Sequence, residues 1–231
     1  MPTLTASSRW LEAWPGAVVG AMTMSGLRNP DSDPALDLAL DETAATLRAR
    51  YAGATRPDLL AVPEFGIYQA FYRRFDKTYH VLLQLESVAL KGKPLRARGA
   101  LVAAMFRAEL EDGLLTAGSD ATLVVGDLHV DVAGPGDRYV GIGGREIDAM
   151  RGDMCIRDAA GIISTVTYGP DDRTRLGPET TSAIFTTYAP TGIGADSVRR
   201  HLEGIAATVR RFAPGASLDA LDIVPTSDDE R

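Results

Sequence analysis

The side chains best suited to chemistry gather between Gly141 and Arg175. The glycine pair Gly143-Gly144 precedes Glu146, and glycine lets a backbone bring this carboxylate close to a ligand. A carboxylate placed in that way can orient an ammonium group or accept a proton from water. The alternative is an exposed glutamate on a solvated hairpin.

The predicted strand Ile162–Tyr168 carries an unusual run of hydroxyl groups. These are Ser164, Thr165, Thr167 and Tyr168. In the polar loop that follows, Arg173 and Arg175 are suited to hold phosphate or carboxylate through paired hydrogen bonds. They are equally suited to ion pairs with Asp171 and Asp172. The whole segment therefore predicts either a small polar pocket or two hairpins with a solvated face.

Several other kinds of site are excluded by motif and spacing. The chain has no nucleophile elbow and no phosphate-binding loop, and GIGGRE lacks the GxGxxG spacing of a dinucleotide loop. Its three histidines are scattered without the spacing of zinc ligands. We therefore expect neither a metal nor a cofactor.

Composition indicates an ordinary folded protein of 231 residues, 45% hydrophobic and 24% charged. The single cysteine, Cys155, excludes an internal disulfide and is expected to be buried and inert. No apolar run reaches the roughly 18 residues of a membrane span, and MPTLTASSRW does not resemble a secretory signal. The expected location is the cytoplasm, without a membrane partner.

Positive charge is concentrated in one part of an otherwise acidic chain. The net charge is −7, yet the segment Arg73–Arg107 contains eight basic and two acidic residues. A basic patch on an acidic body can contact a polyanion such as RNA. The alternative is an ordinary solvated surface.

Hydrophobic periodicity predicts helices in the first half of the chain and strands in the second. A strand is expected over Ala17–Met24, then a helix that Ser32 or Asp33 caps and Gly53 ends. Further helices are expected over 63–75, 79–93 and 99–114, and a final helix from about Asp196, as its capping residue, to Phe212. The helix over 99–114 presents Val102, Met105, Phe106 and Leu110 on one face.

Short strands separated by Gly, Asp and Pro are expected after residue 115. They are Leu123–Val125, His129–Val132, Tyr139–Ile142, Met154–Arg157, Ile162–Tyr168 and Ala183–Tyr188. Their close spacing indicates antiparallel or mixed sheets, so the fold class is α+β. Residues 1–217 are expected to form one domain with an N-terminal extension, and 218–231 an acidic, flexible tail.

Two linked segments resemble a known family. They are YRRFDKTYHVLLQLESVALKGKPLRARGALVAAMFRAELEDGLLTAG (72–118) and the stretch from GDLHVDVAGPGDRYVGIGGREI through GDMCIRDAAGIIS to ETTSAIFTTYAP (126–190). Their order and spacing resemble the editing (B3/B4) domain of the β subunit of phenylalanyl-tRNA synthetase and its free-standing relatives. The resemblance implies a β-sandwich with flanking helices. In the synthetase this domain hydrolyses tyrosine wrongly attached to phenylalanine tRNA.

The resemblance also implies roles for particular residues. Glu146 falls where the synthetase domain has a glutamate that helps recognise the misplaced amino acid, and is the expected catalytic residue. The hydroxyl strand Ser164–Tyr168 would line the amino-acid pocket. Apart from the resemblance, we expect the hydroxyls of Thr116 and Ser119 to line the pocket mouth. The expected RNA contacts are Lys91, Lys93, Arg96, Arg98, Arg173 and Arg175.

The chain departs from the family pattern in one turn and one helix. The family has a histidine where this chain reads Leu115–Asp120, and an Asp and an Asn near Ala103 and Phe106. Two functions therefore follow as hypotheses. One is a free-standing deacylase that hydrolyses a mischarged aminoacyl-tRNA. The other is a module that binds an amino acid or similar ligand without turnover. Amino acid, tRNA and oligomeric state stay open.

Overall fold

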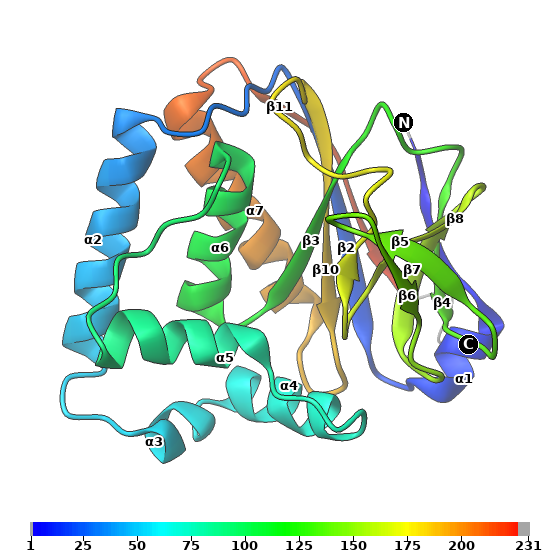
Figure 1. Cartoon of the computed structure of the whole chain (residues 1–231), viewed down its shortest axis with the longest axis horizontal. Helices are drawn as coiled ribbons and strands as arrows, with labels where there is room; N and C mark the ends of the chain where they lie inside the picture. Colours follow the sequence, from blue (N-terminus) through cyan, green and yellow to red (C-terminus); the bar gives the residue numbers. More distant parts are fainter. Residues whose placement is uncertain (1, 226–231) are drawn as a thin grey trace.

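A four-stranded sheet forms the middle layer of the molecule (Figure 1). The computed structural model describes residues 2–225. The strand order is β11 (Ser217–Val224), β2 (Val18–Ser25), β10 (Ser182–Ala189) and β3 (Leu115–Asp120), and all neighbours are antiparallel. Nearly every residue of β2, β10 and β3 is buried, because other elements cover both faces of the sheet.

Three helices lie on one side of this sheet. They are α2 (Pro34–Arg50), α6 (Ala100–Asp112) and α7 (Ala195–Phe212), and they pack against one another, with α6 and α7 next to the sheet (Figure 1). The helix α7 lies directly on β2, where a Cβ added to Gly20 would come within 2.5 Å of Val198. The absence of a side chain at Gly20 is therefore what lets α7 approach the sheet so closely.

Short helices form the lower edge of the helical layer in Figure 1. They are α3 (Arg56–Leu60), α4 (Pro63–Arg73), α5 (His80–Leu85) and the π-helix η1 (Glu86–Leu90). Aromatic side chains join α4 to the start of α5: Tyr68 stacks on Tyr79 with ring centroids 4.5 Å apart. This packing holds α5 beside the sheet edge.

A second sheet covers the opposite face of the middle sheet. Its order is β1 (Leu4–Ala6), β4 (Leu128–Val132), β7 (Met154–Asp158), β8 (Gly161–Thr165) and β9 (Gly169–Pro170). The pair β1–β4 is parallel and the others are antiparallel. The helix α1 (Ser8–Ala13) packs against β4, and the hairpin β5 (Arg138–Gly141)–β6 (Arg145–Asp148) lies beside β8. Ser164 of β8 hydrogen-bonds Tyr188 of β10, so the two sheets meet in a sandwich.

The predicted α+β class, with mixed sheets and flanking helices, is confirmed. Several local predictions are also confirmed. Asp33 caps α2 by accepting from the N–H groups of Ala35 (2.9 Å) and Leu36 (3.3 Å). The Gly143-Gly144 turn has positive φ at both residues, and Cys155 is fully buried, with burial raising its pKa to about 12.

Four local predictions were wrong. Leu115–Asp120 is the edge strand β3 and not a turn. Leu123–Val125 is not a strand, because Asp120 accepts from the Thr122 N–H and turns the chain. The strand β8 ends at Thr165, so Val166–Tyr168 is a turn, and Gly194 rather than Asp196 stands at the N-cap of α7.

The predicted flexible tail begins too early. Residues 218–224 belong to β11, which pairs with β2 along its length. Residues 218–223 of this strand are only partly buried, and its pairing with β2 shifts register between Leu218 and Ala220. The remainder of the predicted tail, 226–231, lies outside the described residues. The predicted N-terminal extension contributes β1 to one sheet and β2 to the other.

Candidate functional site

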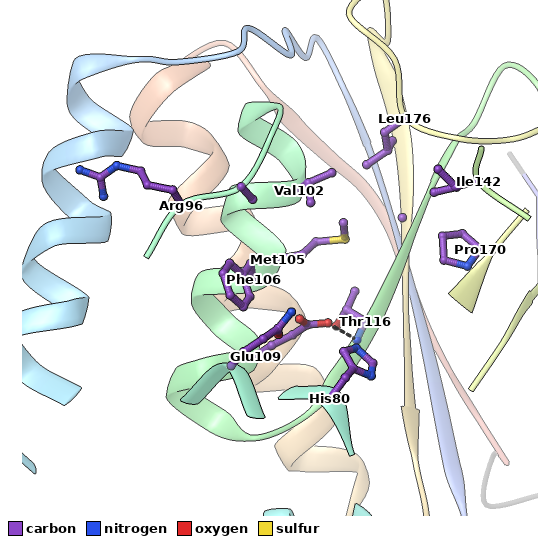
Figure 2. Close-up of a pocket in the computed structure, with 13 residues that line it drawn as sticks. His80, Arg96, Val102, Met105, Phe106, Glu109, Thr116, Ile142, Pro170 and Leu176 are labelled. Atoms are coloured by element: carbon purple, nitrogen blue, oxygen red, sulfur yellow. Dashed lines mark hydrogen bonds between the residues drawn. The ribbon is translucent and has the colours of Figure 1, made fainter. Parts of the chain in front are cut away.

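A cavity of about 320 Å³ opens where α6 faces the edge strand β3. We call it the α6–β3 cavity. Figure 2 shows Met105 reaching from α6 toward a space that Leu176, Ile142 and Pro170 border on the other side. Its lining consists of His80, Gln84, Arg96, Ala97, Val102, Met105, Phe106, Glu109, Thr116, Gly118, Ile142, Pro170 and Leu176. The volume suits a ligand the size of an amino acid.

Most of the wall is apolar because the helical repeat of α6 brings Val102, Met105 and Phe106 to one face. Val102 and Phe106 are only partly buried, although they share the apolar face of α6 with the buried Leu110. Gly118 keeps the space open from the strand side. A Cβ at this position would come within 2.7 Å of Leu176 and 2.9 Å of Met105.

One carboxyl group, that of Glu109, lies in this apolar wall. Only 7% of Glu109 is exposed, and its Oε1 accepts a hydrogen bond of 2.9 Å from the Thr116 N–H (Figure 2). No Lys, Arg or His of residues 2–225 forms an ion pair with it. Burial therefore raises the pKa of Glu109 to about 8, and the Thr116 N–H limits that rise. The group is neutral over much of the physiological range until a cation reaches it.

A backbone donor faces the same region. The N–H groups of Thr116 and Asp120 point away from β10, since they donate to Glu109 and to the Thr174 carbonyl. Alternate residues of a strand direct their N–H groups to the same side, so the Gly118 N–H also points away from β10, to the edge of β3 where Ser119 pairs with Arg175. Within residues 2–225 no acceptor takes a hydrogen bond from it. The cavity thus combines a buried carboxyl with a free N–H.

Two polar side chains of α5 complete the wall. The Oε1 of Gln84 is buried and has no hydrogen-bond partner among residues 2–225. An unpaired buried acceptor favours a ligand that brings a donor. His80 Nδ1 lies 3.3 Å from the Tyr72 hydroxyl, and desolvation by neighbouring atoms lowers the pKa of the imidazole.

These groups match the chemistry of an acyl compound that carries an amine. The apolar wall suits a hydrophobic side chain, the Gly118 N–H suits a carbonyl oxygen, and Glu109 with Gln84 suits an ammonium group. A backbone N–H directed at a carbonyl oxygen also stabilises the negative charge that develops there during ester hydrolysis.

The chain was compared with family models, curated proteins and solved structures, and only the solved structures match it. No family model and no curated protein matches the chain. The fold is similar to a crystal structure of an N-terminal fragment of the phenylalanyl-tRNA synthetase β-subunit from Pyrococcus horikoshii, with a TM-score of 0.48 and 9% sequence identity. The likeness covers 97% of this chain and 54% of that one, so this chain spans about half the length of the fragment.

Two of the residues predicted from sequence line the α6–β3 cavity. They are Thr116, which was expected at the pocket mouth, and Arg96, which was expected to contact RNA. Ser119, the other expected mouth residue, is 3% exposed and accepts a hydrogen bond of 3.1 Å from Thr174. It does not line the cavity.

The predicted hydroxyl strand does not line this cavity either. Ser164 hydrogen-bonds Tyr188, and the Thr165 hydroxyl lies 3.2 Å from that of Tyr139. Thr167 donates to Asp153 at 2.6 Å. The hydroxyls of Ser164 and Thr165 therefore join β8 to its neighbours, and that of Thr167 fixes the turn after β8. The exposed Tyr168 ring has its centroid 4.0 Å from the Lys77 ammonium.

Glu146 lies on the exposed hairpin β5–β6, outside the α6–β3 cavity. Its side chain is 71% exposed and its carboxylate lies 3.9 Å from Arg138. Together with Tyr168 it borders a separate hollow of about 200 Å³. Its catalytic role stays a prediction.

The six cations expected to contact RNA divide into two groups. Lys91, Lys93 and Arg98 are exposed, and no carboxylate of residues 2–225 pairs with them. The other three each pair with an aspartate. The pairs are Arg96–Asp41 (2.9 Å), Arg173–Asp158 (2.8 Å) and Arg175–Asp172 (2.6 Å).

Sequence reasoning missed Glu109, Gly118 and Gln84. A signal existed for Glu109, which follows Met105 by four residues and Phe106 by three, and so shares their apolar face. Burying a carboxyl group on a helix lowers the stability of the fold unless a hydrogen bond or an ion pair compensates for it, so such a group is a candidate for a functional role. No comparable signal existed for Gly118, whose role depends on strand alternation in a segment expected to be a turn.

Proposed function

We propose that this protein binds an aminoacyl group in the α6–β3 cavity and hydrolyses the ester that joins it to a tRNA. The observation that carries the proposal is that the buried Glu109 carboxyl and the unbonded Gly118 N–H both belong to the same apolar cavity wall. The resemblance of segments 72–118 and 126–190 to editing domains supports the tRNA ester as the substrate.

Each part of the substrate has a partner in the wall. The amino-acid side chain lies against Met105 and Phe106, and the ester carbonyl accepts from the Gly118 N–H. The α-ammonium group faces Glu109, whose pKa falls when a cation approaches, so that the carboxylate form is favoured. Editing specificity would then depend on the shape of the apolar wall.

The RNA would approach from the loop that precedes α6. Arg96 and Ala97 of this loop line the cavity, and the free cations Lys91, Lys93 and Arg98 flank them. Phosphate contacts by these side chains make binding weaken steeply as salt rises. A tRNA end held there has its terminal ester close to the cavity.

A second candidate is a module that binds a free amino acid or similar ligand without turnover. The observation that favours it is the ion pairing of Arg96, Arg173 and Arg175, which reduces the positive charge available to RNA. The net charge of −7 acts in the same direction. Thermal-shift measurements with free amino acids, with and without tRNA, separate the two candidates.

The deciding experiment is a panel of mischarged tRNAs, followed for loss of the aminoacyl group. Wild-type protein is expected to hydrolyse at least one of them faster than buffer does. Glu109→Gln removes the ammonium partner while keeping size, and should lower the rate about 100-fold, as loss of a charged contact in a buried site does. Gly118→Ala fills the cavity and should raise KM.

The matched control is Glu146→Gln on the exposed hairpin. Equal losses in Glu109→Gln and Glu146→Gln would place both carboxylates in the site. A loss in Glu146→Gln alone would restore the site expected from sequence. If no tRNA in the panel is deacylated and free amino acids raise the melting temperature in a salt-insensitive way, the binding module is the correct function.

A further inference from the structure

A chain of hydrogen bonds runs from the cavity wall into the helical layer. The Thr116 hydroxyl on β3 lies 2.7 Å from Nε2 of His201 on α7. Nδ1 of His201 lies 3.1 Å from Oδ2 of Asp112, at the end of α6. The Thr116 hydroxyl also lies 2.9 Å from that of Thr187 on β10. His201 and Thr187 are fully buried, so the contacts of the Thr116 hydroxyl are shielded from water, whereas the Asp112 carboxylate is half-exposed.

The chemistry of the groups fixes the direction of each bond for a neutral imidazole. A carboxylate only accepts, so Nδ1 of His201 carries the proton and donates to Asp112. Nε2 then has a lone pair and accepts from the Thr116 hydroxyl. The Thr187 hydroxyl donates to Thr116, because the Thr116 proton is already engaged. The result is a hydroxyl whose proton points at a base that a carboxylate orients.

This arrangement has the geometry of an activated nucleophile. A hydroxyl within 2.6–3.2 Å of a base, with a third group orienting that base, defines the pattern of covalent acyl transfer. Thr116 lines the α6–β3 cavity, and the free Gly118 N–H lies two residues further on the same strand. Nucleophile and carbonyl-binding donor therefore reach one ligand from one strand.

We propose that Thr116 is the nucleophile of the ester hydrolysis, with His201 as its base and Asp112 as the group that orients His201. The inference rests on the proposed function, since it assigns the reacting group at the same cavity. It replaces direct attack by water with two successive acyl transfers.

The first transfer forms an ester on Thr116. Its Oγ1 bonds to the acyl carbon, the hydroxyl proton passes to Nε2 of His201, and the Gly118 N–H holds the negative oxygen. The bond to the leaving hydroxyl breaks, and that oxygen takes the proton from His201. In the second transfer a water molecule attacks the acyl carbon, gives one proton to His201, and displaces Thr116, which regains it. The net reaction is ester plus water to acid plus alcohol.

The test uses the p-nitrophenyl ester of phenylalanine, which needs no tRNA. Wild-type protein should release nitrophenol in a burst equal to one acyl group per chain. Intact-mass measurement after acid quenching should show one phenylalanyl adduct, and peptide mapping should place it on Thr116. An adduct on another residue, or none, overturns the proposal.

Variants provide the second measurement. Thr116→Val keeps the shape but removes the hydroxyl, and should lose the adduct and reduce turnover by about 10²–10⁴-fold. Asp112→Asn changes a half-exposed side chain and should slow acylation about 10-fold or more while leaving KM unchanged. The matched control is Thr186→Val. Thr186 is buried like Thr116, but it lies on β10 and its hydroxyl donates to the Ala117 carbonyl at 3.3 Å. It should keep the wild-type burst.

The outcomes separate this inference from the proposed function. If the small ester acylates Thr116 but no tRNA is deacylated, Thr116 is a nucleophile and tRNA is not the substrate. If Thr116→Val still deacylates tRNA at a rate within about three-fold of wild type, the proposed function stands and Thr116 is not the nucleophile. If Thr116→Val does not fold, the Thr116→Ser variant and the mapped adduct test the proposal instead. Thr116→Ser keeps a hydroxyl, so it must show both the burst and an adduct at position 116.

Discussion

Glu109 and Glu146 show that burial, and not the local sequence, distinguishes two carboxyl groups of the same chain. Glu146 has the more suggestive neighbours, yet its carboxylate is largely exposed and lies near Arg138. Glu109 stands in an unremarkable helical run, yet it is buried in an apolar wall with one N–H partner. Burial raises the pKa of Glu109 to about 8, and raised pKa values of this kind gather at sites of binding and catalysis.

The raised pKa of Glu109 predicts a particular pH dependence of stability. Its pKa rises from 4.5 in the unfolded chain to about 8 in the fold, so the folded state holds the proton more tightly. Stability from this group is complete below pH 4.5 and is lost as the pH rises to about 8. Glu109→Gln should remove that loss, making the variant more stable than wild type at pH 8 by an amount on the order of a few kcal/mol.

Denaturant unfolding of both proteins between pH 5 and 9 measures this effect. The buried Asp153, with its pKa raised to about 6, is present in both proteins and cancels in the difference. Two stability curves that stay parallel across this range would show that Glu109 titrates normally.

At the scale of elements, the contact between α7 and β2 decides how the helical layer is placed. Gly20 lies under Val198 and Leu202, at 2.5 and 2.9 Å from an added Cβ. The same helix holds His201, which contacts Thr116 at the cavity wall. A shift of α7 therefore changes the site as well as the core.

Gly20→Ala should destabilise the protein by about 1–3 kcal/mol, because the inserted methyl group forces α7 away from the sheet. Its matched control is Gly204→Ala on α7, where an added Cβ meets nothing within 4 Å. That change should stabilise the helix by roughly 0.5–1 kcal/mol. Urea unfolding of the two variants gives opposite signs if the packing is as described.

At the scale of the whole molecule, the C-terminal strand closes one side of the middle sheet. β11 pairs with β2 from Ser217 to Val224, and β2 would otherwise present an open edge.

Among residues 2–225, no helix is long and apolar enough to cross a membrane.

A chain that ends at Ala216 should therefore fold poorly and aggregate, because an exposed apolar edge strand pairs with other chains. Light scattering and size-exclusion chromatography of the truncated and full chains measure this outcome. A monomeric truncated chain with an unchanged melting temperature would mean that β11 adds nothing to the sheet.

The sequence alone determined the features that depend on local pattern. Periodicity located α2, α6 and α7, Asp33 was identified as a cap of α2, and the glycine pair located the β5–β6 hairpin, since each depends on residues close in the chain. The α+β class followed from the order of helices and strands.

Tertiary structure decided the site. The α6–β3 cavity joins Glu109, Thr116 and Ile142 from separate elements, and His201 reaches Thr116 across 85 positions of the chain. No spacing rule relates such residues, because strand pairing and helix packing bring them together. The same packing buried the hydroxyls of Ser164 and Thr165, which the sequence had presented as a pocket wall. Local pattern specifies which residues can react, while burial and long-range contacts decide which of them meet a ligand.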